Sequence, residues 1–280
     1  MIDYYQNRRQ EERRARHHKI AAVFFGLVII LILAGLYWLM HSQILEIRGF
    51  AVNVNNQDEG LKKSVEQIFY SELGDEALSK IFTNNKNILI ADIYKKSIMS
   101  DIQKDLPLIK NVSIDANIFG RDISIEVQTR EHYAIWCTGN INSSSSSSSS
   151  DISFPECFWF DRTGFVFDNA PSTEGQLIYK VLDFSGEAVS IGNSILPNDE
   201  SGNLVKMFNL LDSVGISYRT LYLKDRQLEE VTSDRNRSPV FYFSLRNDPS
   251  YALHALQTLG SELNKLQYID LRIPNRIYYR

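Results

Sequence analysis

The sequence predicts a single N-terminal transmembrane α-helix followed by an α+β ectodomain in two parts. Residues 20–40 form an uncharged apolar run, and residues 44–130 show strand and helix patterns in the order β-α-α-β-β. From residue 131 onward the patterns are mainly those of strands, with two later helices. Because strands that alternate apolar and polar residues predict a sheet with one covered face, we expect a small first domain and then a mostly antiparallel β domain with two packed helices.

Length, composition and charge narrow the class of protein. The chain has 280 residues, 44% of them hydrophobic and 23% charged, which excludes a disordered chain. Residues 1–19 hold six basic and three acidic residues and carry +3, whereas the remaining 24 basic and 31 acidic residues leave −7 on the rest. A body of that sign repels phosphate backbones, so we expect no nucleic-acid partner.

Ile20–Met40 is the segment that predicts a membrane helix. Its 21 residues carry no charge, and at about 1.5 Å per residue it spans roughly 31 Å, close to the hydrocarbon thickness of a bilayer. A buried core helix would seldom be this long, and a cleaved signal peptide would need a small-residue cleavage site that His41–Leu45 does not offer. The basic residues before the helix predict a cytoplasmic N-terminus, with residues 41–280 across the lipid bilayer.

Residues 44–130 are the expected first domain. Asp58 is placed to cap a helix whose apolar stripe is Leu61, Val65, Ile68 and Phe69. The expected elements are, in order, a strand over 44–54, a helix after Asp58, a helix from about Asp92 to Pro107, and strands over 110–118 and 122–130.

Residues 131–280 are the expected second domain. One predicted helix carries Leu204, Phe208 and Leu211 and ends at Gly215, and the other has Asp248 as its cap and Pro249 as its first residue. The predicted strands cover 133–138, 157–161, 165–168, 178–184, 217–223, 229–232, 240–246, 268–273 and 276–280.

The only two cysteines, Cys137 and Cys157, flank a predicted flexible loop over residues 140–153. That loop contains the unbroken serine run Ser143–Ser150, which has no apolar face to bury. A disulfide closing about twenty residues would contribute roughly 3 kcal/mol. Two separate buried thiols fit the sequence equally well, because the sequence does not give the distance between them.

The sequence predicts no catalytic, cofactor or metal site. The histidines His17, His18, His41, His132 and His254 have no metal-ligand spacing, and two cysteines alone cannot build a zinc site. There is no Gly-x-Ser-x-Gly elbow and no phosphate-binding glycine loop. A membrane-anchored enzyme such as a glycosyltransferase is the main alternative, but no two aspartates stand one residue apart.

Three segments carry a family resemblance. Asp105–Trp136 resembles the end of the POTRA domain in the FtsQ/DivIB family of bacterial cell-division proteins. The matching residues are Leu106-Pro107, Ile109-Lys110-Asn111-Val112, Thr129-Arg130 and Ala134-Ile135-Trp136. Phe158–Phe167 resembles a hairpin of that family, and Tyr268–Arg272 resembles its late "Val-Asp-Leu-Arg" strand. His132 departs from the pattern, because proline is usual there, and so does Phe50, where the family often has asparagine.

The resemblance implies a non-enzymatic scaffold of the divisome, without a cofactor or a small-molecule substrate. It implies a single-pass type II protein of the bacterial inner membrane, at the division septum. The POTRA domain would meet other divisome components, and the second domain would bind a partner of the FtsB/DivIC type, which is joined to FtsL. A POTRA-type assembly chaperone is the remaining alternative, although that class normally ends in a long barrel.

In that family the partner is understood to add a strand to the C-terminal edge of the β domain. An edge strand offers unpaired N–H and C=O groups, and Pro274 just before the expected edge itself favours an edge position. A simple closing strand is the alternative. Arg237 is included because Arg237-Ser238 resembles an Arg-Ser pair in some members. The candidate partner-binding residues are Arg237, Ile273, Asn275, Arg276, Ile277, Tyr278 and Tyr279.

Overall fold

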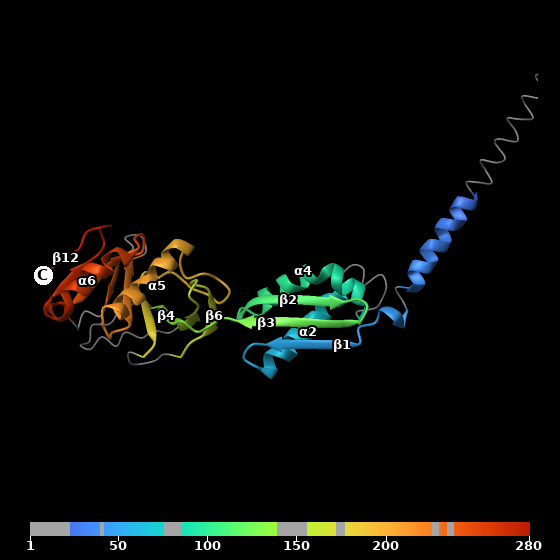
Figure 1. The fold of residues 1–280 in the computed structure, drawn as a ribbon, viewed down its shortest axis with the longest axis horizontal. Helices are drawn as coiled ribbons and strands as arrows, with labels where there is room; N and C mark the ends of the chain where they lie inside the picture. The colour runs from blue at the N-terminus through green and yellow to red at the C-terminus, as the bar shows by residue number, and fades with distance from the viewer. Residues whose placement is uncertain are drawn as a thin grey trace, which may run out of the picture. The chain divides into compact units, whose positions relative to one another are not determined.

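The computed structural model describes residues 23–39, 42–75, 86–138, 156–171, 177–225, 230–233 and 238–280. The chain divides into two compact units, drawn in blue to green and in green to red in Figure 1. The first consists of Met1–Ile102 and Asn111–Gln128, and the second of Gln103–Lys110 and Thr129–Arg280. The predicted basic tail 1–19 and the predicted loop 140–153 lie outside the described residues.

The predicted transmembrane helix requires a correction. Within the described ranges, no helix combines the length and the apolar character needed to cross a membrane. The helical residues described in this region are 23–39. The finding that no described helix could cross a membrane contradicts the predicted single-pass membrane protein with an N-terminal anchor. The predicted localisation depended on that anchor and is wrong with it.

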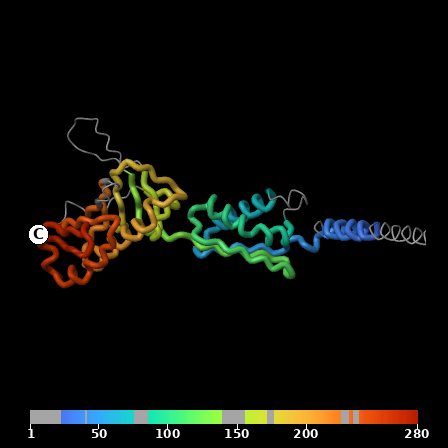
Figure 2. The backbone as a smooth tube through the Cα atoms, turned by 90° about the horizontal axis from the view of Figure 1, so that it is seen from above, coloured from blue at the N-terminus to red at the C-terminus, as the bar shows by residue number. Residues whose placement is uncertain are grey.

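The first sheet has three strands in the order β1-β3-β2. β1 is parallel to β3, with Gly49 opposite Asp122 and Val54 opposite Val127. Figure 2 shows helices α2 and α4 on one side of these strands. The elements are η1 (Gln43–Leu45), β1 (Gly49–Val54), α2 (Glu59–Asp75), α4 (Ile88–Asp105), β2 (Ile109–Asn117) and β3 (Asp122–Thr129).

Local chemistry explains where the two helices begin. The Asp58 carboxylate accepts hydrogen bonds from the backbone N–H groups of Gly60 (2.8 Å) and Leu61 (3.1 Å), as predicted for a cap. Helix α4 begins four residues before the predicted Asp92, because the side chain of the buried Asn87 accepts a hydrogen bond from the N–H of Leu89 (2.9 Å). Both helices bury one apolar stripe against the sheet, including Val65, Phe69, Leu73, Ile98 and Ile102.

The predicted fold class also requires a correction. The described part of the chain holds twelve strands in two sheets, and its first unit shows no clear POTRA arrangement. The first strand is shorter than predicted, because Gln43–Leu45 form a 3₁₀ turn and the strand begins only at Gly49. We therefore describe the fold as α+β with a three-stranded and a nine-stranded sheet.

The nine-stranded sheet has the order β12-β11-β10-β9-β8-β7-β4-β5-β6. Helices α5 (Asn198–Ser213) and α6 (Leu253–Leu259) belong to the same unit, and 3₁₀ turns η2 (Pro249–Ala252) and η3 (Gly260–Lys265) flank α6. The strands are β4 (Ala134–Thr138), β5 (Glu156–Phe160), β6 (Val166–Asn169), β7 (Tyr179–Asp183), β8 (Thr220–Asp225), β9 (Glu230–Ser233), β10 (Val240–Ser244), β11 (Tyr268–Asp270) and β12 (Tyr278–Tyr279).

This sheet is mixed: five of its eight neighbouring strand pairs are antiparallel and three are parallel. The pairs β4–β7, β7–β8 and β10–β11 are parallel. Parallel neighbours need a crossover connection. Helix α5 connects β7 to β8, and the η2–α6–η3 segment connects β10 to β11. The two helices recognised in the sequence are thus crossovers, and they account for two of the three parallel pairs.

One face of the nine-stranded sheet and the helices enclose the main core of the second unit. Trp136, Phe160, Phe241 and Phe243 from the sheet lie in the same buried cluster as Phe208 of α5. The opposite face has a smaller buried cluster around Ile135, Cys137 and Cys157. The strands near β4 are therefore apolar on both faces, which fits the central place of β4 in the sheet.

Candidate functional site

The C-terminal strand β12 forms one edge of the nine-stranded sheet, with no described strand beyond it. Its register places Tyr279 opposite Ile269 and Tyr278 opposite Asp270 of the antiparallel β11. The strand is shorter than the predicted 276–280. Arg280 nevertheless continues the pairing, because its N–H donates to the carbonyl of Tyr268 (3.3 Å) and its carbonyl accepts from the N–H of Tyr268 (3.4 Å).

This pairing determines which backbone groups face outward. In an antiparallel pair, residues that exchange hydrogen bonds alternate with residues that do not. Since Arg280 exchanges hydrogen bonds with Tyr268, the N–H and C=O of Tyr279 point away from β11. The Tyr279 side chain is 55% exposed and that of Tyr278 is 44% exposed. The outer edge of β12 can therefore accept another strand.

A turn positions β12. Pro274 and Asn275 are its central residues, and the N–H of Arg276 donates to the carbonyl of Ile273 (3.2 Å). Asn275 has a φ of 59°, and proline followed by a left-handed residue is typical of a type II turn. Ile277 then packs against the main core. All but one of the predicted partner-binding residues thus lie in one continuous turn and edge: Ile273, Asn275, Arg276, Ile277, Tyr278 and Tyr279. The remaining one, Arg237, lies outside the described residues.

Two residues that the sequence analysis missed hold this turn in place. The Tyr251 hydroxyl lies 2.9 Å from the carbonyl oxygens of both Ile273 and Arg276, so it can donate its single proton to either. Burial raises the pKa of Tyr251, and the nearby Asp270 charge raises it further, so the hydroxyl keeps its proton. The Asn247 side-chain amide donates to the carbonyl of Arg272 (2.6 Å). Neither residue belongs to a motif, and only the folded structure brings them to the turn.

Arginine and tyrosine side chains line the sheet beside this edge. Arg272 donates two hydrogen bonds to the Asp270 carboxylate (2.9 and 2.6 Å) and lies over the Tyr242 ring, 5.2 Å from its centroid. Burial alone would raise the pKa of Asp270, but the hydrogen bonds from Arg272 outweigh it and hold this pKa below its ordinary value. Arg276 is exposed beside the Tyr278 hydroxyl (3.4 Å). Tyrosine and arginine are enriched in protein interfaces.

The opposite edge of the sheet is covered. The outer side of β6 pairs with a segment that follows β7, and Phe165 forms a bridge with Ser194. The N–H of Val166 donates to the carbonyl of Asn193 (2.9 Å), and the N–H of Gly192 donates to the carbonyl of Val166 (2.9 Å). Gly192 has a φ of 91°, which glycine adopts without strain. Since the start of β6 is already paired on its outer side, β12 is the more open edge among the described residues.

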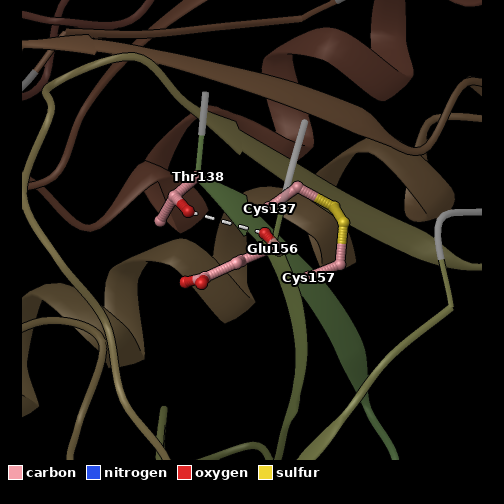
Figure 3. Close-up of a disulfide and its surroundings, with 4 residues drawn as sticks. All are labelled: Cys137, Thr138, Glu156 and Cys157. Carbon is pink, nitrogen blue, oxygen red and sulfur yellow. Dashed lines mark hydrogen bonds between the residues drawn. A yellow bond between two sulfur atoms is a disulfide. The ribbon is translucent and has the colours of Figure 1, made fainter. Parts of the chain in front are cut away.

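The two cysteines lie away from β12. Cys137 of β4 and Cys157 of β5 are directly opposite each other in the sheet and are joined by a disulfide, with their Cα atoms 4.1 Å apart. Figure 3 shows the bond next to the pair Thr138–Glu156, where the Thr138 hydroxyl donates to the Glu156 carbonyl (3.5 Å). Five strands separate β4 from β12 in the sheet order. The disulfide therefore joins the strands at the base of segment 139–155 and takes no part in the edge.

Within the described ranges, no group of three or more histidine, cysteine, aspartate or glutamate residues could hold a metal ion. The arrangement at β12 instead provides main-chain donors and acceptors, with arginine and tyrosine side chains beside them. Such a surface can bind an extended peptide by main-chain pairing. No protein-family model matches the chain. No curated protein matches it either.

Proposed function

We propose that the chain is a non-enzymatic scaffold that binds another protein by adding the partner's strand to the outer edge of β12. The observation that carries this proposal is the contrast between the two ends of one sheet. The edge at β6 is paired by residues 192–194, whereas the main-chain groups of Tyr279 point away from the sheet. An open edge is a template for strand pairing, and proteins usually block edges that they do not use.

The proposed partner is a bacterial division protein of the FtsB/DivIC type, together with its FtsL-type companion. This identity rests on the resemblance of three segments to the FtsQ/DivIB family. The exposed Arg276 beside the edge favours a partner strand that carries acidic side chains, because opposite charges across an interface accelerate association and fix the register. Recruitment of further divisome components by the first unit is part of the same proposal.

A binding titration of the full-length chain with the FtsB/DivIC-type protein of the same organism tests the proposal. Tyr279→Pro removes an outward-pointing N–H, and proline is tolerated on an edge strand where that group faces solvent. We expect it to weaken binding about a hundredfold, because it removes one main-chain hydrogen bond and its ring obstructs the next strand. Ile277→Pro should act in the same way.

Tyr279→Ala is the matched control, since it removes the ring and keeps the N–H. It should weaken binding less than about tenfold. Equal affinities of wild type and Tyr279→Pro, with both proteins folded, would exclude the edge as the binding site. Absence of any binding by the wild-type chain would exclude this class of partner.

A further inference from the structure

A second polar cluster on the nine-stranded sheet is separate from the β12 edge. We name it the Arg–Tyr cluster, and it consists of Tyr133, Arg162, Tyr179, Asp212 and Arg219. Tyr133 precedes β4, Arg162 follows β5, Tyr179 begins β7, Asp212 lies in the last turn of α5, and Arg219 precedes β8. Five segments of the second unit thus contribute one side chain each.

Stacking fixes the orientation of both arginines. The Arg162 guanidinium lies over the Tyr133 ring, 4.7 Å from its centroid, and the Arg219 guanidinium lies 4.8 Å from the centroid of the Tyr179 ring. The two tyrosine rings are themselves 5.4 Å apart. The Tyr179 hydroxyl donates to the Asp212 carboxylate. The rings thus hold two guanidinium planes close together at little further cost in side-chain entropy.

The two arginines of the cluster differ in their acidic partners among the described residues. Arg219 lies 3.7 Å from the Asp212 carboxylate, which is the single carboxylate of the cluster. Arg162 is exposed, and among the described residues it has neither a carboxylate within 4.0 Å nor an acceptor for its N–H groups. Burial raises the pKa of Tyr133 and of Tyr179, so neither phenol supplies a negative charge. Among the described residues, the positive charge of Arg162 therefore has no acidic partner, and it sits on a side chain that is already oriented.

An apolar side chain lies beside the cluster. Leu177 is 89% exposed, and its carbonyl accepts a hydrogen bond from the Arg219 guanidinium (3.0 Å). This contact keeps an exposed apolar residue next to Arg219 of the cluster. Hot spots of protein interfaces are typically composed of arginine and aromatic side chains surrounded by apolar contacts.

We infer that the Arg–Tyr cluster is a second protein-binding surface, and that it takes a partner segment with an acidic side chain next to a large apolar one. A guanidinium that stacks on a ring through its face keeps its N–H donors at its edges, where they match the two oxygens of a carboxylate. The acid would pair with Arg162, and the apolar neighbour would cover Leu177. In the sheet order, β7 and β4 are well separated from β12, so this surface can be occupied independently of the edge.

A random peptide library displayed on phage, selected on the full chain and counter-selected on Arg162→Ala, tests this inference. We expect the surviving peptides to carry aspartate or glutamate next to leucine, phenylalanine or another large apolar residue. The affinity of a synthetic survivor, measured by fluorescence anisotropy, should fall about tenfold or more for Arg162→Ala. It should fall less for Arg162→Lys, which keeps the charge but loses the planar donor pair.

Lys265→Ala is the matched control, because it removes an exposed positive charge from a surface ion pair with Glu262. It should leave the affinity unchanged, and Leu177→Ala should weaken it several-fold. Selection that leaves no peptide, or survivors without acidic residues, would overturn the inference. Displacement of the peptide by inorganic phosphate at low millimolar concentration would reassign the cluster to small anions.

Discussion

The two edges of the nine-stranded sheet differ in how far other segments of the chain pair with them. At the β6 end, a disulfide joins β4 to β5, the Arg130–Asp161 ion pair holds the hairpin after β5, and residues 192–194 cover the last strand. At the β12 end, a turn and hydrogen bonds from Tyr251 and Asn247 position a short strand with no described strand on its outer side. In the described part of the chain, one edge is thus covered where its last strand begins, and the other is available for pairing.

The largest effect is expected at the closed end, for Asp161→Ala. The Asp161 carboxylate lies 2.6 Å from Arg130 and also accepts hydrogen bonds from Thr163 and Phe165. Its removal leaves Arg130, which is largely buried, without this partner. We expect a loss of about 3–5 kcal/mol in the free energy of unfolding, measured by urea denaturation. The exposed Asp168 of the same end is the control, and Asp168→Ala should cost less than about 0.5 kcal/mol. Similar losses for both variants would contradict the role of the ion pair.

Reduction of the disulfide is the next largest expected change. The bond joins residues 20 apart, and a loop of that size corresponds to about 3 kcal/mol in the loop-entropy model. Thermal unfolding with and without a reducing agent measures the effect, and the double variant Cys137→Ala/Cys157→Ala should match the reduced protein. Partner binding at β12 should survive, because five strands lie between. Loss of binding on reduction would show that the two ends are coupled.

The open end should respond to Tyr251→Phe. This variant keeps the ring and removes the hydroxyl that holds the turn before β12, so we expect a loss of about 1 kcal/mol in stability and a several-fold weaker partner affinity. Tyr242→Phe is the matched control, since among the described residues its hydroxyl has no hydrogen-bond partner. Unfolding curves and binding titrations of the two variants separate the effects. An unchanged affinity for Tyr251→Phe would mean that the turn does not preorganise the edge.

The smallest expected effect is on the pH dependence of stability. Burial would raise the pKa of Asp161, but hydrogen bonds from Thr163, Arg130 and Phe165 outweigh it and hold this pKa below its ordinary value. A carboxyl with a lowered pKa in the folded state stabilises the protein above its unfolded-state pKa, and this contribution is lost as the pH falls through the folded-state value. Stability should therefore decrease below about pH 4. Urea denaturation at a series of values between about pH 2 and pH 6 measures the free energy of unfolding of wild type and of Asp161→Asn. This free energy should fall less steeply with decreasing pH for the variant than for wild type. Equal slopes for the two proteins would contradict this account.

Local patterns predicted many elements of the fold. The alternation of Ile123, Ile125 and Val127 gave β3 almost to the residue, and all three side chains are buried. The cap at Asp58 marked the start of α2. Asparagine before an apolar run is also a capping signal, so Asn87 could have marked the true start of α4. In each of these cases neighbouring residues determine the structure.

Contacts between distant segments were not predictable in this way. The parallel pairs β7–β8 and β10–β11 follow from crossover helices whose direction no alternation pattern shows. Likewise, the position of Tyr251 beside the turn at Pro274 and the covering of β6 by residues 192–194 depend on the folded chain. The sequence therefore indicated β12 as a candidate edge, and the structure adds that the opposite edge is closed.

Hydrogen exchange of two adjacent amides tests the central claim most directly. With ¹⁵N-labelled tyrosine, the N–H groups of Tyr278 and Tyr279 can be followed in one NMR sample. The register directs the first toward β11 and the second away from the sheet. In the free chain Tyr279 should exchange much faster than Tyr278, and a saturating FtsB/DivIC-type partner should slow Tyr279 selectively. An amide of Tyr279 that still exchanges rapidly in the saturated complex would contradict strand addition at β12.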